Sequence, residues 1–331
     1  MALRIGLTGD VMLGRLVDER QRRRAVTSVW GTVLDRLQRL DGLLVNLECC
    51  LSDRGRPWRR TRRAFHFRAN PAWAIPALEA GGVDACALAN NHVLDFEVPA
   101  LYDTLDHLDE AAIARAGAGR DRDDALDPAV LSVDGLDVAV VSFTDNTPEY
   151  AATATSPGTA WIDVDVDDAE TRGTVEEELA RAAARDPDLL IASLHWGPNM
   201  VTAPPERFRE FGRWLVAQGV DLVHGHSAHV FQGIEVVDGR PICYDTGDFV
   251  DDYAVDPDLR NDRGFLFELS VTTDGDLREL RLVPTQIDDC AVHEADPAVA
   301  RWSRERMIAR SAPFGTTFER DGEHLVVPLS T

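Results

Sequence analysis

The chain has 331 residues, 44% of them hydrophobic, so it can bury the core of one large α/β domain or of two small ones. Its formal net charge is −23, and its basic residues are all arginines, because the sequence contains no lysine. A protein that binds nucleic acid or anionic membranes over a broad surface usually carries the opposite charge, so we expect neither as a partner.

The start of the chain gives no sign of export. No run of about eighteen apolar residues is present, so we expect no membrane span. The first residues, MALRIGLTGDVML, lack the basic region and the small-residue cleavage pattern of a signal peptide, and we interpret them as a first strand. These features predict a cytoplasmic protein. The five cysteines form no C-x-x-C pair, which argues against a disulfide framework and a thiolate zinc site.

In chain order, short apolar runs typical of strands alternate with helical patterns, which indicates an α/β protein. The predicted strands of this part are 3–8, 43–48, 83–89, 136–143, 189–196 and 220–225, and the predicted helices are 29–40, 98–113, 175–188 and 205–219. From residue 234 onward the pattern changes to consecutive strands joined by turns, with one helix near 302–312. No linker rich in Pro, Gly or Ser divides the chain, so we predict a single domain over 1–331, with a closing hairpin and helix in 285–331.

Polar side chains that can bind metal stand at the ends of five predicted strands. They are Asp10; Asn46 and Glu48; Asn90, Asn91 and His92; His195; and the cluster of His224, His226 and His229. Taken singly, each has a structural explanation of at least equal weight, such as a turn or helix cap for Asp10 and a core position for His195. The joint pattern favours a site, because the carboxyl ends of strands in an open α/β sheet converge on one crevice.

Carboxylate, amide oxygen and imidazole together suit manganese, iron or zinc ions. Two such ions about 3.5–4 Å apart would share a bridging carboxylate and activate a water, and Glu48 is the candidate bridge. The sequence therefore predicts one or two divalent metal ions as cofactor.

Six phrases, in order along residues 9–249, resemble the poly-γ-glutamate capsule-biosynthesis (CapA-type) family. They are GDVMLGR, VNLECCLSD, ALANNHVLDF, LHWGPNM, VDLVHGHSAHV and GIEVVDGRPICYDTGDF. That family is similar in fold to the calcineurin-like metallophosphoesterases. The resemblance implies an α/β fold, a four-layer α/β/β/α metallophosphoesterase-like sandwich, with a dinuclear site at the strand ends.

The resemblance also implies roles for the matching residues. The implied metal ligands are Asp10 and His229 for the first ion, Asn91, His195 and His226 for the second, and Glu48 as the bridge. His92 would protonate a leaving group or stabilise developing charge, and Asp95 would orient its ring.

The chain departs from the phosphoesterase pattern at a few positions. Met12 stands where a histidine is usual, and a thioether cannot replace imidazole for these metals, so the number of bound ions stays open. His224 is either a substitute ligand, a residue behind the ligands or a strand residue. Asp245 and Asp248 are either partners of the histidines or turn residues.

The segment 54–68 contains seven arginines and no acidic residue in an acidic chain. Guanidinium groups bind phosphate and carboxylate through paired hydrogen bonds, so we predict that Arg63 or Arg68 binds an anionic small-molecule or polymer substrate. For most of these arginines a solvated loop is an equal alternative. We interpret Phe65, His66 and Phe67 as part of a strand that enters the core, rather than as a platform for stacking bases.

Together these features predict a metal-dependent hydrolase in which metal-activated water attacks an anionic phosphoester or γ-glutamyl-type substrate. The alternative is a non-catalytic accessory protein that binds during poly-γ-glutamate capsule synthesis or export.

Overall fold

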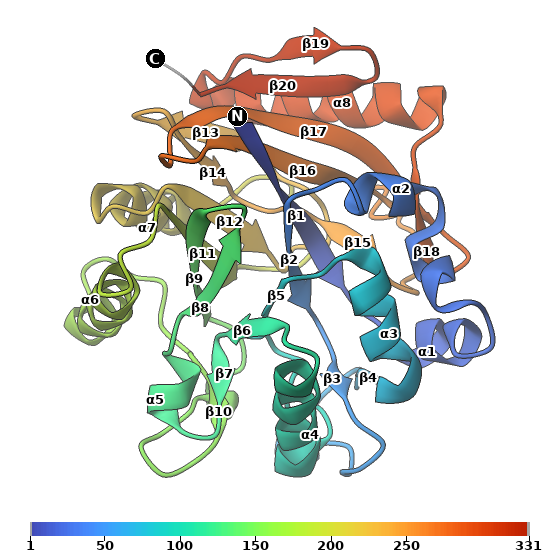
Figure 1. The fold of residues 1–331 in the computed structure, drawn as a ribbon, viewed down its shortest axis with the longest axis vertical. Helices are drawn as coiled ribbons and strands as arrows, with labels where there is room; N and C mark the ends of the chain where they lie inside the picture. The colour runs from blue at the N-terminus through green and yellow to red at the C-terminus, as the bar shows by residue number, and fades with distance from the viewer. Residues whose placement is uncertain (1, 330–331) are drawn as a thin grey trace.

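Two β-sheets packed face to face form the centre of the structure, a computed structural model that describes residues 2–329 (Figure 1). Residues 1, 330 and 331, which the single-domain prediction includes, lie outside the described residues.

The larger sheet has ten strands. They are β1 (Ala2–Val11), β2 (Gly42–Leu47), β5 (Ala85–Ala87), β6 (Ala114–Ala116), β15 (Asp248–Val250), β16 (Arg263–Thr272), β17 (Leu277–Asp288), β18 (Ala291–Glu294), β19 (Glu319–Asp321) and β20 (His324–Pro328). Its main path runs β19-β20-β17-β16-β1-β2-β5-β6. Strands β1, β2, β5 and β6 are parallel, and β16, β17, β20 and β19 extend the sheet in antiparallel fashion.

The second sheet has six strands in the order β13-β14-β12-β11-β9-β8. They are β8 (Ala129–Val133), β9 (Leu136–Thr144), β11 (Leu189–His195), β12 (Leu222–His226), β13 (Ile234–Val237) and β14 (Arg240–Cys243). Two small pairs join β3 (Cys50–Leu51) to β4 (Arg68–Ala69), and β7 (Ala118–Gly119) to β10 (Gly158–Thr159).

Helices cover the outer faces of both sheets. The α-helices are α1 (Arg15–Gln21), α2 (Leu34–Leu37), α3 (Pro71–Gly81), α4 (Glu97–Glu110), α5 (Arg122–Ala125), α6 (Ala169–Ala183), α7 (Glu206–Ala217) and α8 (Pro297–Ser311). Three 3₁₀ segments are η1 (Val26–Val33), η2 (Pro148–Tyr150) and η3 (Ala312–Phe314). In Figure 1, α6 and α7 lie on one side of the paired sheets, and α1, α3 and α4 lie on the other.

Alternation of apolar side chains along the strands produces this layering. In β9, Val138 and Val140 belong to the cluster between the sheets, whereas Ala139, Val141 and Phe143 pack with the outer helices α6 and α7. Successive side chains of a strand point to opposite faces, so a strand that is apolar on both faces needs a layer on each side. The α/β/β/α sandwich predicted from the resemblance is therefore confirmed.

Strand register brings the predicted polar residues together at one edge. In the larger sheet Asp10 is in register with both Asn46 and Asp248, and in the second sheet His195 is in register with His226. Because the sheets face each other, these two sets of strand ends meet.

The helix predicted for residues 29–40 is interrupted. The structure divides this segment between η1 and α2, with a kink at Gly31, where φ is 39°. A Cβ at Gly31 would lie 2.4 Å from the carbonyl oxygen of Val292, so the close approach of β18 requires glycine here.

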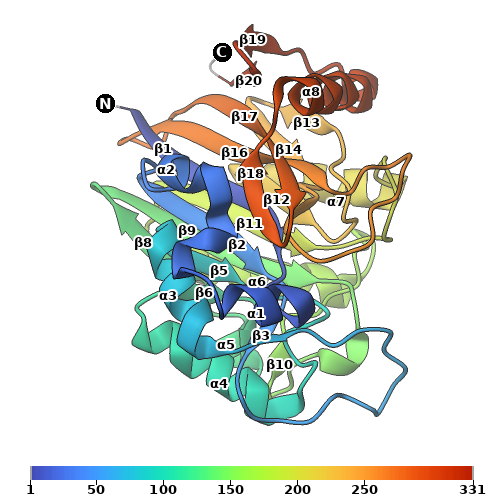
Figure 2. The same ribbon diagram turned by 90° about the vertical axis from the view of Figure 1, so that its right-hand side faces the viewer.

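The ends of the molecule differ in character. Figure 2 shows α8, β19 and β20 together at one end, and the connection from β3 to β4, residues 52–67, as a long loop towards the other. Within residues 2–329, none of the helices is long and apolar enough to cross a membrane.

Candidate metal centre

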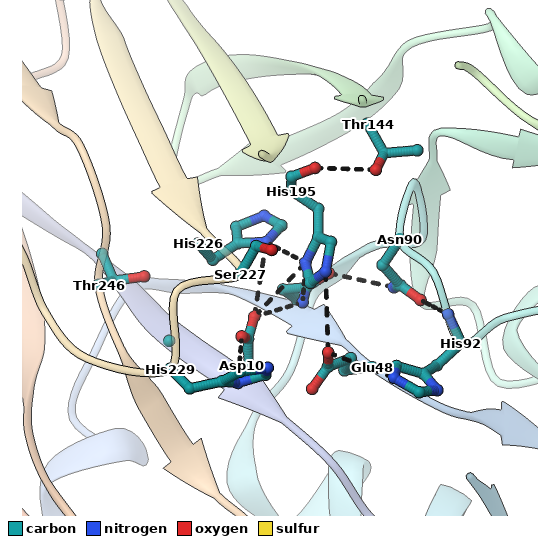
Figure 3. A network of polar contacts seen from close by, with 12 residues as sticks. Asp10, Glu48, Asn90, His92, Thr144, His195, His226, Ser227, His229 and Thr246 are labelled. Atoms are coloured by element: carbon teal, nitrogen blue, oxygen red, sulfur yellow. Dashed lines mark hydrogen bonds and ion pairs between the residues drawn. The ribbon is translucent and has the colours of Figure 1, made fainter. Parts of the chain in front are cut away.

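The candidate metal centre lies where the strand ends of the two sheets meet. Asp10 comes from the end of β1, Glu48 directly follows β2, and His195 and His226 end β11 and β12. His229 comes from the loop after β12, and Figure 3 shows the five side chains pointing toward one another. All five are buried.

Their ligand atoms form two overlapping groups that could each hold a metal ion. In one, Asp10 Oδ1 lies 3.5 Å from His226 Nδ1 and 3.8 Å from His195 Nδ1. In the other, Asp10 Oδ2 lies 3.4 Å from His229 Nδ1, with Glu48 close by. Asp10 belongs to both groups, whereas the sequence predicted that Glu48 would be the shared residue. Glu48 Oε1 also faces the second group, at 3.7 Å from His195 Nε2.

Several atoms of this cluster, and one atom of the predicted ligand Asn91, are buried without a hydrogen bond. Glu48 Oε1, His195 Nε2, Asp10 Oδ2 and Asn91 Oδ1 have no hydrogen-bond partner among residues 2–329. The 3.7 Å between Glu48 Oε1 and His195 Nε2 is too long for a hydrogen bond, but it suits two ligands that each lie about 2.0–2.2 Å from a shared ion. The donor set therefore fits a divalent cation.

The loop that carries His229 adopts an unusual backbone conformation. Ser227 has φ of 110° and His229 has φ of 59°, values that residues other than glycine rarely adopt. The carboxylate of Asp245 holds the loop by accepting hydrogen bonds from the N–H groups of Ala228 at 2.7 Å and Gly247 at 2.8 Å. Such conformations persist only when the surroundings enforce them, and they are concentrated at functional sites.

Burial shifts the protonation of the cluster. Burial raises the pKa of Asp10 to about 6, although the charge of His229 acts to lower it. Burial also raises the pKa of Glu48 well above its usual range, and the charge of Asp10 adds to that shift. Burial also lowers the pKa values of His195 and His226 well below that of a free imidazole. At His229 burial acts in the same direction, but the carboxylates of Glu48 and Asp10 outweigh it and raise the pKa. Buried ionisable groups of this kind cost free energy unless a partner charge compensates them.

A chain of hydrogen bonds behind the cluster fixes the proton positions on His226. His224 Nε2 lies 2.7 Å from the carbonyl oxygen of Thr8, which can only accept, so this nitrogen carries the proton. Burial lowers the pKa of His224 to about 4, so the ring is neutral and its Nδ1 accepts from the Ser193 hydroxyl at 3.1 Å. Ser193 Oγ must then accept from Nε2 of His226 at 3.0 Å, which leaves the lone pair of His226 Nδ1 pointing at Asp10.

The same logic extends to His195. Its Nδ1 lies 2.9 Å from the unprotonated Nδ1 of His226 and must donate the hydrogen bond. The lone pair of His195 is therefore on Nε2, the atom that faces Glu48. His195 Nε2 is thus an unprotonated nitrogen that faces the cluster, as a metal ligand requires. The single lone pair of His226 Nδ1 would serve an ion only in place of the contact with His195. His224 lies behind the ligands, in contact with Ser193.

His92 borders the cluster on another side. The carboxylate of Asp95 accepts hydrogen bonds from His92 Nδ1 at 2.5 Å and from the N–H of Phe67 at 2.7 Å. This contact leaves His92 Nε2 free, 3.9 Å from Glu48 Oε1. Burial lowers the pKa of His92 even though Asp95 raises it.

Four residues beside the cluster, whose roles the sequence did not settle, contact the candidate ligands or the turns that carry them. Asp248 accepts a hydrogen bond from His229 Nδ1 at 2.8 Å, so it is a partner of the histidines, and Nε2 is the nitrogen that His229 has left to offer to an ion. Tyr253 donates its hydroxyl to Glu48 Oε2 at 3.2 Å, and Asn46 donates to Asp10 Oδ1 at 2.6 Å. Asn90 donates to the carbonyl oxygen of Leu47, and its own Oδ1 accepts from two N–H groups of the turn that follows it. The phrase YDTGDFVDDY contains both Asp248 and Tyr253 and was the available signal for them.

The remaining predicted residues lie at varying distances from the cluster. Met12 is buried, and its sulfur accepts a hydrogen bond from the N–H of Gly14 at 3.1 Å. The guanidinium of Arg63 lies over the ring of Tyr150, 4.4 Å from its centroid, and that of Arg68 lies over Phe96 at 4.0 Å. Arg68 lines a hollow on the surface beside α1 rather than the cavity at the cluster.

One interpretation of the arginine-rich segment is wrong in part. Phe67 is buried as predicted, at 1% exposure, but β4 begins only at Arg68 and Phe65 is 53% exposed. Phe65 and Phe67 both line the cavity beside His92 and His229. The alternating aromatic residues therefore form a surface next to the candidate centre.

The fold and the buried cluster define this chain as a metallophosphoesterase-like α/β sandwich with a candidate metal centre at its strand ends. Its sequence matches the family described as bacterial capsule synthesis protein PGA_cap over residues 4–253. The chain belongs to this family, which confirms the CapA-type resemblance.

Named relatives cover nearly the whole chain. A protein of Mycobacterium tuberculosis described as a probable polyglutamine synthesis accessory protein is 32% identical over 93% of this chain and 91% of its own length. The capsule biosynthesis protein CapA of Bacillus anthracis is 29% identical over 99% of this chain and 78% of its own length. The PGA biosynthesis protein CapA of Bacillus subtilis is 26% identical, with 89% and 73% covered.

Proposed function

We propose that this chain is a metal-dependent hydrolase with a role in poly-γ-glutamate capsule biosynthesis, acting on an anionic phosphoester or γ-glutamyl-type substrate. The observation that carries the proposal is the buried set of carboxylate and imidazole atoms that lack hydrogen-bond partners among the described residues. A scaffold has no structural need for such atoms, whereas a divalent cation satisfies them together.

The proposal assigns the ligands as follows. Asp10, Glu48 and His229 would hold one ion, and His195, His226 and Asn91 would hold a second, with Asp10 or Glu48 shared between them. Manganese, iron and zinc suit this mixture of oxygen and nitrogen donors. A bound ion supplies Lewis acidity and lowers the pKa of water at the site.

The side chains around the ligands supply the rest of the chemistry. Hydrolysis forms a bond from the water oxygen to phosphorus or carbonyl carbon, breaks the bond to the leaving oxygen or nitrogen, and moves one proton from water to the leaving group. His92 would carry this proton at Nε2, because its Nδ1 is held by Asp95. Asp95 is the positioning residue, since it also binds the N–H of Phe67 and so ties the imidazole to the chain.

The substrate class follows from the relatives and from charge. Relatives named for capsule and PGA biosynthesis support a γ-glutamyl-type substrate, and the fold supports a phosphoester. Either is anionic, so Arg63 and Arg68 remain candidates for contacts outside the cluster.

A non-catalytic accessory protein is the second candidate, favoured by the description of the Mycobacterium tuberculosis relative as an accessory protein. In that case the metal would hold the strand ends together and the chain would act by binding. The two candidates differ at His92, which carries a proton in the hydrolase and has no required role in a binding protein.

Elemental analysis of the purified protein tests the metal assignment. We expect one or two bound ions per chain, fewer in Asp10→Ala and His226→Ala, and no change in the control His107→Ala, which alters a half-buried histidine of α4. A metal-free protein after loading with manganese, iron or zinc would refute the assignment.

Turnover then separates the hydrolase from the accessory protein. His92→Ala is expected to abolish hydrolysis of phosphoesters and γ-glutamyl amides while metal content stays at the parent value. An unchanged rate in His92→Ala would remove the mechanism and leave the binding role.

A further inference from the structure

We infer that the substrate carries a flat apolar group, such as an aromatic ring, on its leaving-group side, and that Phe65 is the specificity-determining residue that binds it. This inference rests on the proposed function, because it places the reacting bond at the candidate metal centre. It adds a substrate feature that a simple polyanion lacks.

The inference begins with a cavity of about 360 Å³ that opens beside the cluster. His92 and His229 line it together with Phe65, Phe67 and Tyr253. A substrate that reaches the metal ligands through this cavity must therefore pass an aromatic surface.

The aromatic rings form a row that starts at His92. The ring of Phe67 stacks on the imidazole of His92, with centroids 3.8 Å apart and planes 27° apart. Phe65 continues the row, 6.3 Å from Phe67 and nearly parallel to it, with planes 14° apart. Since His92 exchanges a proton with the leaving group in the proposed mechanism, the group that departs lies along this row.

Phe65 is the exposed end of the row. It is 53% exposed, whereas Phe67 is 1% exposed, so Phe65 adds little to the core and presents apolar surface at the cavity. Met200 is 37% exposed and lines the same cavity. Thioether and aromatic side chains together provide an adaptable surface for a flat ring.

Arg15 adds a polar contact to the row. Its guanidinium carbon lies 4.7 Å from the centroid of Phe65 and 5.6 Å from that of Phe67. Nη2 pairs with Asp252 at 3.2 Å, but Nη1 is buried with no hydrogen-bond partner within the described part of the chain. The ion pair with Asp252 holds the guanidinium against the two aromatic rings at the cavity wall.

A chain of glutamate residues fits this lining less well than an aryl or similar leaving group does. Among the described residues that line the cavity, Arg15 is the one arginine, and the two carboxamides of Asn199 and Asn261 are neutral. An extended polyanion is usually bound by several cations, whereas aromatic stacking contributes affinity without charge.

Binding of phosphonates, which contain no hydrolysable ester bond, tests the inference without any turnover. Titration calorimetry on manganese-loaded protein compares phenylphosphonate with methylphosphonate. The two compounds differ only in the group on phosphorus, which is an aromatic ring in one and a methyl group in the other. We expect the parent to bind phenylphosphonate at least about tenfold more tightly, equivalent to about 1.4 kcal/mol. In Phe65→Ala the preference should fall to about threefold or less, with methylphosphonate affinity unchanged.

Two control variants guard against indirect effects. Phe65→Tyr keeps the ring and should keep the preference. Ile308→Ala removes another exposed apolar side chain, on α8, and should also keep it. Because Phe65 is largely exposed, its replacement by alanine is expected to leave folding and metal content unchanged.

The possible failures are distinguishable. Three results would each overturn the inference while metal content continues to support the hydrolase. They are equal binding of the two phosphonates by the parent, no binding of either phosphonate to metal-loaded protein, and a preference for phenylphosphonate that persists in Phe65→Ala. A protein that takes up no metal would overturn the proposed function, and the inference would fall with it.

Discussion

The Ser193→Ala substitution should weaken metal binding without touching a ligand. Ser193 forms a hydrogen bond with each of His224 and His226, accepting from His226 and donating to His224. Without its hydroxyl, the proton on His226 is no longer confined to Nε2. The tautomer with the proton on Nδ1 then directs N–H, instead of a lone pair, at the cluster.

The magnitude follows from the groups left unpaired. The substitution strands a buried donor on His226 and a buried acceptor on His224, and each such group costs about 1–3 kcal/mol. We expect the free energy of unfolding of the metal-free protein to fall by about 2–4 kcal/mol, because neighbouring groups relax in part. Metal affinity should fall by roughly 10–100-fold, as for other losses of a hydrogen bond that orients a ligand.

The chain offers a matched control in Ser142. It lies on β9 in register with Ser193, is equally buried, and its hydroxyl has no hydrogen-bond partner among residues 2–329. Ser142→Ala therefore removes the same atoms from the neighbouring strand without breaking a hydrogen bond. Its metal affinity should equal that of the parent.

Three measurements make up the assay: urea unfolding of the metal-free protein, metal affinity by competition with a chelator, and ¹⁵N NMR of the imidazoles. In the parent, the His226 nitrogens should show a proton on Nε2, and in Ser193→Ala a mixture of tautomers. If Ser193→Ala and Ser142→Ala bind metal equally well, the hydrogen-bond chain does not set the tautomer and the reasoning is refuted.

Other regions give further predictions. Burial raises the pKa of Glu178 well above 4.5, so the folded state holds a proton that the unfolded state releases, and stability is lost as pH rises through that window. Glu178→Gln should therefore raise the midpoint of thermal unfolding more at pH 8 than at pH 5. The control Glu176→Gln, on the exposed face of the same helix, should leave the midpoint unchanged at both pH values. Equal effects of Glu178→Gln at the two pH values would contradict this reasoning. A Cβ at Gly9 would lie 1.9 Å from a backbone carbonyl oxygen, so Gly9→Ala should lower the free energy of unfolding by about 3 kcal/mol or more in chemical denaturation. Gly173 lies in open space within α6, so Gly173→Ala should raise the free energy of unfolding by about 0.5–1 kcal/mol. Metal binding should release protons, and because the pKa of Asp10 is raised to about 6, calorimetry in buffers of different ionisation enthalpy should find more protons released at pH 5.5 than at pH 8.

The sequence predicts the strand ends well because their pattern is local. Each parallel strand is an apolar run with a polar residue where it leaves the sheet, and this pattern places Asp10, Glu48, His195 and His226 without knowledge of the register. A period of two also puts His224 on the same face as His226, and Ser193 on the same face as His195. The contact between Ser193 and the two histidines needs two further facts, that β11 and β12 are neighbours and that Ser193 is in register with His224.

The loops are less predictable because no periodicity governs them. Phe65 and Phe67 alternate as strand residues do, yet their segment forms a loop whose position depends on tertiary contacts, including the hydrogen bond from the N–H of Phe67 to Asp95. Arg15 follows the first strand by four residues, and its contact with Phe65 joins segments fifty residues apart. Such contacts are set by the packed fold, and neither residue carries a local signal for them.

The candidate centre is the part of the core that a sequence selected for stability alone would not contain. Asp10, Glu48 and Asp248 are buried side by side, and at each of them burial and a neighbouring carboxylate raise the pKa. Apolar residues of similar size would avoid this cost, since a buried set of charges is often less stable than a hydrophobic replacement. The flanking loop adds strain, because His229 is held at positive φ. The carboxylates, the unpaired His195 Nε2 and the strained loop meet at one point, and a bound cation is the single change that would offset their cost together.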